Sequence, residues 1–446
     1  MTELLILSIT VLFLGSIAFI VYWRGAQLDV LSIYTIMVGL YFGPYTILDL
    51  LINGADDVAP ESAVLAIGSV MVCTTIVCLM YLLMPSDYGE CLLLRNLVSH
   101  WRRVDTTAVM LSSAAAIIFQ AYVFVTYGVL THVYTDDLEK IGIDIPSWIA
   151  PSRELANCVA FAAILFYFSK LIGRSKLGWA NGLLLVVSIA MFGLLGRRAL
   201  FNIGMIGLFI LLVENKKHTI SLRAFALSVL AVIVLLFFSN IYQTYRHDLS
   251  YQAAEAQSET IALVEAAGNF QATIDNLSDR IAMWRFNEMI VAKQLDHPLN
   301  VLGGELTWQA LKNSIPGAVW QRKEVVDIDE MVAIFYDFPV TDYPTSNFST
   351  LQADYGFGMV LLASILSIGV IFLIMSVNRI APRRPFIFLM VSGFALQYLI
   401  NIENSLGDIF ILFRNVALIS CVYIGFETIR MCYQTVIQEV FVRPSC

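Results

Sequence analysis

The residues best suited to chemistry lie in a polar segment, 240–349, between two strongly apolar stretches of the chain. Cationic side chains occur there with aromatic side chains among them, including Arg280, Arg285, Trp320, Arg322 and Lys323. Guanidinium groups are planar and can contact phosphate oxygens in pairs. No Ser-His-Asp arrangement is evident in the sequence, so the chemistry to expect is charge stabilisation on an anion. The polar segment is therefore the place to look for a site that acts on a water-borne substrate.

A second pair of cations, Arg197 and Arg198, follows Gly196 in the middle of the apolar stretch 179–213. One straight helix of this length would reach about 52 Å, well past the roughly 30 Å hydrocarbon core of a membrane. We therefore expect two short helices joined by a tight turn at Gly196, with the arginines at the tip. They either extend to lipid phosphates or form a fixed cationic site for a phosphorylated lipid head group.

Three further polar residues lie at expected membrane boundaries. Asn347 belongs to a run of hydroxyl and amide side chains before the apolar stretch 351–375, and Asp354 lies just inside that stretch. Glu403 lies in the turn between the last two apolar stretches. An ionisable residue at such a position is a functional candidate by default. Arg414, inside the final stretch, needs a partner; we expect Glu403, which makes structural pairing the leading role for these two residues.

The polar segment divides into two halves. Few residues in 252–294 would break a helix, and apolar residues recur there at steps of four and three, which predicts an amphipathic helix. Arg285 and Glu288 are three residues apart on this helix, so a local salt bridge is an equal alternative to a role in binding. The second half is rich in Gly, Pro and aromatic residues and is expected to be irregular.

Divalent metal chemistry is not expected. Asp327 and Asp329 have a spacing that can hold an ion bridged to phosphates, but such pairs are common on protein surfaces. The acidic pair Asp56 and Asp57 is interpreted as a solvated loop. The seven cysteines lie outside the polar segment and show no zinc-type spacing. We therefore expect no metal, no cofactor and no disulfide framework in the polar segment.

Composition indicates the elements that must position these residues. The 446 residues are 58% hydrophobic and only 14% charged, whereas soluble proteins have about 25% charged residues. Apolar runs near membrane-spanning length predict an all-α polytopic membrane protein with about eleven transmembrane helices. The first run lacks a basic leader and is expected to remain as a helix. The eleven runs are 4–23, 30–52, 63–84, 107–127, 155–172, 179–195, 199–213, 224–242, 351–375, 386–400 and 409–426.

Three regions follow from this pattern: spans 1 to 8 in residues 1–239, one large outer loop in 240–349, and spans 9 to 11 with a cytoplasmic tail in 350–446. Basic residues decide the orientation. With the loop outside, the inner segments hold 15 lysines and arginines and the short outer segments hold five. Because positively charged loops stay on the cytoplasmic side, we expect the N-terminus outside and the C-terminus in the cytoplasm.

These features together resemble the Wzy-type polymerases of bacterial surface polysaccharides, which join O-antigen or other oligosaccharide repeat units. The resemblance covers about residues 193 to 369. Gly317, Glu324 and Gly356 depart from the family's usual residues, whereas Arg197 or Arg198, Trp320 and Lys323 match. Three stretches carry it: a glycine-arginine turn in 193–200, an Ile-Pro, aromatic and Lys pattern in 315–324, and the span entrance 354–358.

The resemblance implies a metal-independent glycosyltransferase of the bacterial inner membrane. Its substrate would be a polyprenyl-pyrophosphate-linked oligosaccharide, and its partners membrane lipid and a protein that regulates chain length, with no nucleic acid. Arginines would stabilise the pyrophosphate leaving group, and Asp354 or Glu403 would be the general base. The implied catalytic residues are Arg197, Arg198, Arg280, Arg285, Asp354 and Glu403. The implied substrate-binding residues are Trp320, Arg322, Lys323 and Asn347.

Other functions stay open. An O-antigen ligase would use the same donor with a lipid A-core acceptor, and His247 or His297 fits its large outer loop. A flippase or other transporter of lipid-linked oligosaccharides often shows internal repeats and charges at mid-membrane, whereas this chain shows no repeat of its span pattern. A non-catalytic subunit of polysaccharide assembly is a further alternative.

Overall fold

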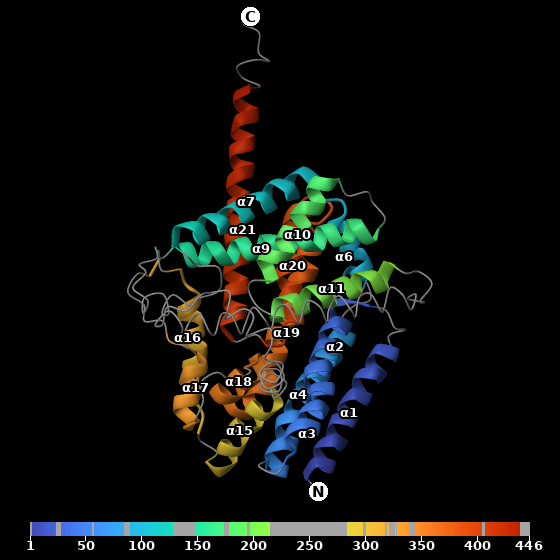
Figure 1. Cartoon of the computed structure of the whole chain (residues 1–446), viewed down its shortest axis with the longest axis vertical. Coiled ribbons are helices and arrows are strands. Elements are labelled where there is room, and N and C mark those ends of the chain that lie inside the picture. The colour runs from blue at the N-terminus through green and yellow to red at the C-terminus, as the bar shows by residue number, and fades with distance from the viewer. Residues whose placement is uncertain are drawn as a thin grey trace, which may run out of the picture.

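The computed structural model of the chain is helical throughout the part that it describes, apart from one isolated bridge between Asp29 and Leu93. It describes residues 2–23, 28–55, 58–83, 90–127, 146, 148–173, 178–193, 197–214, 283–297, 300–316, 319–320, 326, 328–338, 345–403 and 406–437. The all-α fold class is therefore confirmed for these residues. Figure 1 shows the helices and their order along the chain.

Nine helices precede the polar segment. They are α1 (Thr2–Trp23), α2 (Val30–Phe42), α3 (Pro44–Asn53), α4 (Pro60–Leu82), α6 (Leu94–Trp101), α7 (Thr106–Tyr127), α9 (Ile149–Ile172), α10 (Trp179–Gly193) and α11 (Arg197–Glu214) among the described residues. Three short helices follow within the polar segment: α15 (Met283–Asp296), α16 (Glu305–Ser314) and α17 (Ile328–Tyr336). The remainder is α18 (Asn347–Tyr355), the 3-10 turn η1 (Gly356–Gly358), α19 (Met359–Asn378), α20 (Pro385–Ile400) and α21 (Leu406–Ile437).

Seven stretches of the described residues are long and apolar enough to cross a membrane, and three shorter apolar helices accompany them. The shorter ones are Trp179–Phe192, Asn202–Val213 and Pro385–Ile400. These ten agree with ten of the eleven expected spans, and the expected span 224–242 lies outside the described residues. A helical membrane protein is supported, while the number of eleven spans stays a prediction.

Two expected spans are each built from two helices. Pro44 begins α3 directly after Gly43, which divides the span predicted for 30–52. Proline ends the preceding helix because it has no N–H to donate and its ring clashes with a carbonyl of the preceding turn. The second break lies at Gly356, between α18 and α19. The expectation of two helices in 179–213 is confirmed, since α10 and α11 are separate helices that pack against each other. The expected turn at Gly196 lies outside the described residues.

Helix α20 lies at the centre of the packing. Almost every residue from Ile387 to Ile400 is buried, on all sides of the helix. It packs against α2, α6, α9, α19 and α21. A helix that is apolar all round is stable only when it is surrounded. Its Ser392 hydroxyl accepts a hydrogen bond from the indole N–H of Trp101 at 2.9 Å, so α6 is attached to the same centre.

Helix ends that the charge pattern assigns to one side lie together. At the predicted inner side, Val30 donates to the Leu92 carbonyl at 3.1 Å, and Asn378 Nδ2 donates to the Cys91 carbonyl at 3.3 Å. At the predicted outer side, α15 packs on α4, and α16 packs on α21. In Figure 1 the helices α15 and α18 lie near α3 and α4 in the lower part of the view, and α17 lies farther to the left, below α16. The described part of the polar segment therefore lies at one end of the apolar helices. Which side of the membrane this end faces stays a prediction.

Candidate functional site

The structure describes the side chains of half of the predicted site residues. These are Arg285, Trp320, Asn347, Asp354 and Glu403. Arg197 and Arg198 lie in the first turn of α11. Arg280, Arg322 and Lys323 lie outside the described residues, so their predicted roles stay predictions.

Arg285 binds a carboxylate of a membrane helix. Its Nε donates to Asp49 Oδ2 at 2.6 Å, and its Nη2 donates to the Gly54 carbonyl. The indole N–H of Trp284 donates to the same Asp49 oxygen at 2.8 Å. Asp49 is fully buried in α3, where an unpaired carboxylate would be very costly. Arg285 therefore neutralises a buried charge, a role that argues against its expected contact with substrate.

Glu288 also holds α15 against a neighbouring helix, α4. Its Oε1 accepts a hydrogen bond from the Ser62 hydroxyl at the start of α4. The neighbouring Asn287 Nδ2 donates to the Ala66 carbonyl, one turn farther along α4, at 3.2 Å. Arg285 and Glu288 thus both contact neighbouring helices, α3 and α4, while the expected salt bridge between them stays a prediction. These contacts arise because α15 is buried between helices and its polar residues must find partners there.

Asp354 caps another helix of the polar segment. Its Oδ1 accepts from the backbone N–H of Gly304 at 2.8 Å and of Leu306 at 3.1 Å, at the start of α16. Its Oδ2 accepts from the N–H of Thr307 at 2.9 Å and from its hydroxyl at 2.6 Å. The first N–H groups of a helix have no partner within it, and a negative charge is favoured at that end.

The surroundings of Asp354 argue against the expected general base. The residue is fully buried, and both of its carboxylate oxygens already accept two hydrogen bonds. A general base has to reach the substrate hydroxyl directly or through one water. These contacts favour a structural role for Asp354, and its expected role as general base stays a prediction that they do not support.

A buried group of polar side chains joins α15, α17 and α18. Gln294 Nε2 donates to the Tyr336 hydroxyl and to the Gln352 carbonyl, both at 2.8 Å. Gln352 Nε2 donates to Gln294 Oε1 at 2.6 Å, and the Tyr336 hydroxyl donates to the Asn300 carbonyl at 2.9 Å. Burial raises the pKa of Tyr336 to about 12, opposed by the Gln294 hydrogen bond and increased by the nearby Asp354 carboxylate. Tyr336 is thus a neutral donor at physiological pH.

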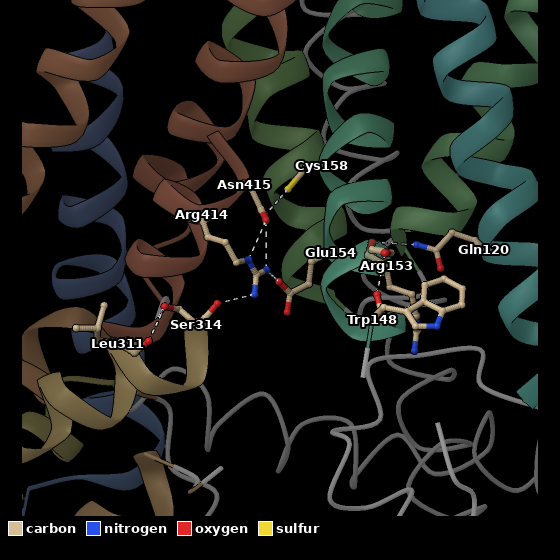
Figure 2. Close-up of polar contacts among 10 residues, drawn as sticks. Gln120, Trp148, Arg153, Glu154, Cys158, Leu311, Ser314, Arg414 and Asn415 are labelled. Carbon is tan, nitrogen blue, oxygen red and sulfur yellow. Dashed lines mark hydrogen bonds and ion pairs between the residues drawn. The ribbon is translucent and has the colours of Figure 1, made fainter. Parts of the chain in front are cut away.

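Arg414 is paired with a different carboxylate from the one expected. Figure 2 shows its guanidinium between Glu154 on α9 and the Ser314 carbonyl at the end of α16. Its Nη1 donates to that carbonyl at 3.0 Å, and its Nη2 pairs with Glu154 Oε2. The expected partner Glu403 lies in the turn before α21. Arg414 lies eight residues after the start of α21, or about 12 Å along it, where Glu154 in the second turn of α9 is its neighbour.

A small cavity with a volume of about 20 Å³ lies among α2, α18, α19 and α20, and both apolar and polar side chains line it. That volume accommodates one or two water molecules or a hydroxyl group. Asn347 Nδ2 donates to the Tyr398 hydroxyl at 2.5 Å, and Ser367 Oγ donates to the Tyr34 hydroxyl at 3.1 Å. The Asn347 Oδ1 atom is buried and accepts no hydrogen bond within the described part of the chain. The polar residues that line the cavity are Tyr34, Asn347, Ser367, Tyr398 and Asn401.

The remaining predicted residues flank these features. Glu403 is 8% exposed and follows Asn401 and Ile402 of the cavity wall. Trp320 is 39% exposed and comes shortly after the end of α16. The structure thus brings Asn347 and Glu403 into one region. Trp320 follows α16, which is held by Asp354 at one end and by Arg414 at the other.

Sequence reasoning missed the carboxylates that balance the buried arginines. Asp49 lies inside the predicted span 30–52 and Glu154 at the start of the predicted span 155–172. A signal for both was present, because a single carboxylate within or beside an apolar run needs a partner. The identity of that partner depends on which helices pack together, and no local pattern reveals it.

No group of three or more His, Cys, Asp or Glu side chains that could hold a metal ion occurs among the residues with described positions. Asp327 lies outside them, while Asp329 Oδ2 accepts a hydrogen bond from the Thr345 hydroxyl at 3.2 Å. Searches of protein families, curated proteins and solved structures find no match to this chain.

Proposed function

We propose that this chain is a membrane glycosyltransferase that polymerises oligosaccharide repeat units linked to polyprenyl pyrophosphate. In this reaction the bond between the anomeric carbon of one repeat and its pyrophosphate oxygen breaks. A new glycosidic bond forms to a hydroxyl oxygen on the terminal sugar of a second lipid-linked repeat. The hydroxyl proton passes to a base, and polyprenyl pyrophosphate leaves with the bonding electrons.

The observation that carries the proposal is the position of Arg197 and Arg198 at the start of α11. No acidic residue occurs in this first turn. The N-terminal end of a helix is electrostatically positive, so two cations there repel the helix dipole unless an anion lies beside them. A pyrophosphate supplies that anion, and helix N-termini bind phosphate groups readily. The pair therefore suits a phosphorylated lipid head group better than it suits a structural role.

Charge development explains why arginines would speed this reaction. The leaving pyrophosphate gains negative charge as its bond to the sugar breaks. Fixed cationic donors stabilise that charge more strongly in the transition state than in the ground state. The proposed contacts come from Arg197 and Arg198, with Arg280, Arg322 and Lys323 as further cations from the polar segment. Arg285 is left out, because it neutralises Asp49.

The acceptor side of the reaction needs a base and a surface for the sugar. Glu403 is the remaining base candidate, since the oxygens of Asp354 are engaged at the start of α16. It follows the cavity wall that Asn347 and Asn401 form. The buried Asn347 Oδ1 can accept from a sugar hydroxyl or a water. Trp320 offers a partly exposed ring on which a sugar can pack.

The proposal is tested by replacing Arg197 and Arg198 singly with Lys. Lysine keeps the charge but loses the planar pair of donors, and a contact that strengthens in the transition state is worth about 2–4 kcal/mol, or roughly 10²–10³ in rate. At least one variant should lose that much polymerising activity at normal expression. Arg383→Lys, in the exposed turn between α19 and α20, is the matched control. Full activity of both variants contradicts the proposed pyrophosphate site.

A further inference from the structure

Helix α16 is held at both ends by charges that come from outside the polar segment. Asp354 of α18 binds its first N–H groups, and Arg414 of α21 binds the carbonyl of its last residue, Ser314. The signs agree with the helix dipole, which favours an anion at the N-terminal end and a cation at the C-terminal end. The ten-residue helix is thus fixed in place from two directions.

Besides hydrogen bonds to its neighbour Asn415, the Arg414 guanidinium makes two separable contacts with other helices (Figure 2). The ion pair with Glu154 joins α21 to α9 and neutralises a cation that is only 12% exposed. An arginine without a partner would be costly among these apolar helices. The second contact, to the Ser314 carbonyl at 3.0 Å, adds α16 to the pair. The ion pair alone would suffice to connect α9 and α21. The contact with Ser314 is not needed for that connection, and its effect is on α16.

That effect extends to Trp320, because the chain runs from Ser314 into a short, internally bonded turn. Val319 N–H and Trp320 N–H both donate to the Pro316 carbonyl, at 2.9 and 3.1 Å. Proline restricts the backbone angle φ at the start of this turn. Because Pro316 follows the end of α16 by two residues and its carbonyl accepts from both N–H groups, a displacement of that end is transmitted to Trp320.

We propose that Arg414 is a positioning residue that places Trp320 for contact with the lipid-linked donor. This inference rests on the proposed function, because only there does Trp320 contact a substrate. A displacement of about 1 Å is enough to cost roughly 10²-fold in rate when it misaligns reacting groups. Arg414 acts through the Ser314 carbonyl and does not itself touch the donor.

A charge exchange separates this role from that of an ordinary ion pair. In the double variant Glu154→Arg/Arg414→Glu the attraction between α9 and α21 is restored. The glutamate at 414 cannot donate to the Ser314 carbonyl and instead repels it. A second double variant, Glu154→Leu/Arg414→Leu, removes both charges together and so leaves neither unpaired. Arg379→Gln, at the opposite end of the helices, is the control.

The first measurement follows the turn itself. A spin label at Val319→Cys, in a background without the seven native cysteines, reports how firmly the turn is held; Val319 is 78% exposed and tolerates the label. The label should gain mobility in both double variants and keep it unchanged in Arg379→Gln. An immobile label in both double variants overturns the inference, whatever the activity.

The second measurement is the rate of glycosyl transfer at varied donor concentration. Both double variants should lose roughly 10- to 100-fold in kcat, measured per folded molecule. A normal rate with a mobile label shows that the position of Trp320 does not matter for the reaction, and overturns the inference. If the wild-type protein transfers no sugar, the proposed function fails and the positioning of a donor fails with it. The label then shows separately whether Arg414 holds the turn.

Discussion

At the scale of the residue, the charges that sequence reasoning selects for chemistry divide into two groups. Arg285, Asp354 and Arg414 each meet an opposite charge or a helix end in the interior. A charge that is taken out of water has to be paired and hydrogen-bonded, so these residues are explained by structure. Arg197 and Arg198 form the second group. They lie at a helix N-terminus, where two cations are favourable only beside an anion.

The sequence predicts that a residue is unusual when the signal is local, but it does not predict partners that lie far away along the chain. Asp354 was recognised as unusual because it lies just inside an apolar stretch, which is a local observation. Its partners Gly304, Leu306 and Thr307 lie about fifty residues earlier, and the spacing between them shows no pattern. The same holds for Arg414, whose need for a partner was evident but whose partner Glu154 lies on a distant helix.

The variant Asp354→Asn tests the structural role of this carboxylate. Asparagine is similar in shape, but it loses the charge and one of the two acceptor oxygens. We expect a loss of about 1–2 kcal/mol in stability, typical of a weakened N-terminal cap, and near-normal specific activity of the folded protein. Thermal unfolding in detergent and the rate per folded molecule measure the two effects. Glu330→Gln, at an exposed position of α17, is the control, and a rate loss above a hundredfold without destabilisation would restore the general base.

At the scale of the element, apolar length predicted the helices well and their interruptions poorly. The pair α10 and α11 was expected because 35 residues exceed the membrane thickness and contain Gly196. The break between α18 and α19 was not expected, although Gly356 is visible in the sequence. Its φ of 58° is left-handed, and this conformation follows from the packing of α18 against the polar segment rather than from a local pattern.

A comparison of two nearby glycines tests the break. Gly356→Ala forces a left-handed conformation on an L residue, at a cost of about 1–2 kcal/mol, and its Cβ would lie 3.4 Å from Val301 Cγ1. Gly358→Ala has a helical φ of −61° and should change stability little. The measurement is the thermal unfolding midpoint of each variant. Equal midpoints for the two variants would show that the break does not depend on the left-handed glycine.

At the scale of the whole molecule, the helix ends that lie together in the structure are those that the distribution of basic residues assigns to one side. The polar segment contacts the turn before α4, the first residues of α4, and α21 near its start. The start of α9 lies beside the same part of α21, through the pair of Glu154 and Arg414. Each of these had been assigned to the same side from the 15-to-5 bias. Charge statistics could therefore predict which ends lie together. They could not predict how closely α15 and α16 are inserted, because that depends on buried pairs between distant residues.

Labelling in intact spheroplasts tests the orientation. In a cysteine-free background, a cysteine at Ile334, which is 72% exposed in the polar segment, should react with an impermeant thiol reagent. A cysteine at Asp105, exposed at the opposite end, should react only after lysis. The reverse pattern would place the polar segment in the cytoplasm and remove the basis for a substrate on the outer face.

The most direct test of the proposed polymerase is to supply its substrate. The purified protein in lipid vesicles is incubated with a synthetic repeat unit on polyprenyl pyrophosphate, with and without a chelator of divalent ions. The account predicts a ladder of products that differ by one repeat, with release of polyprenyl pyrophosphate and no effect of the chelator. A single addition to lipid A-core would indicate a ligase, and movement of the lipid without a new glycosidic bond would indicate a transporter. Either result, or no product at all, would contradict the account.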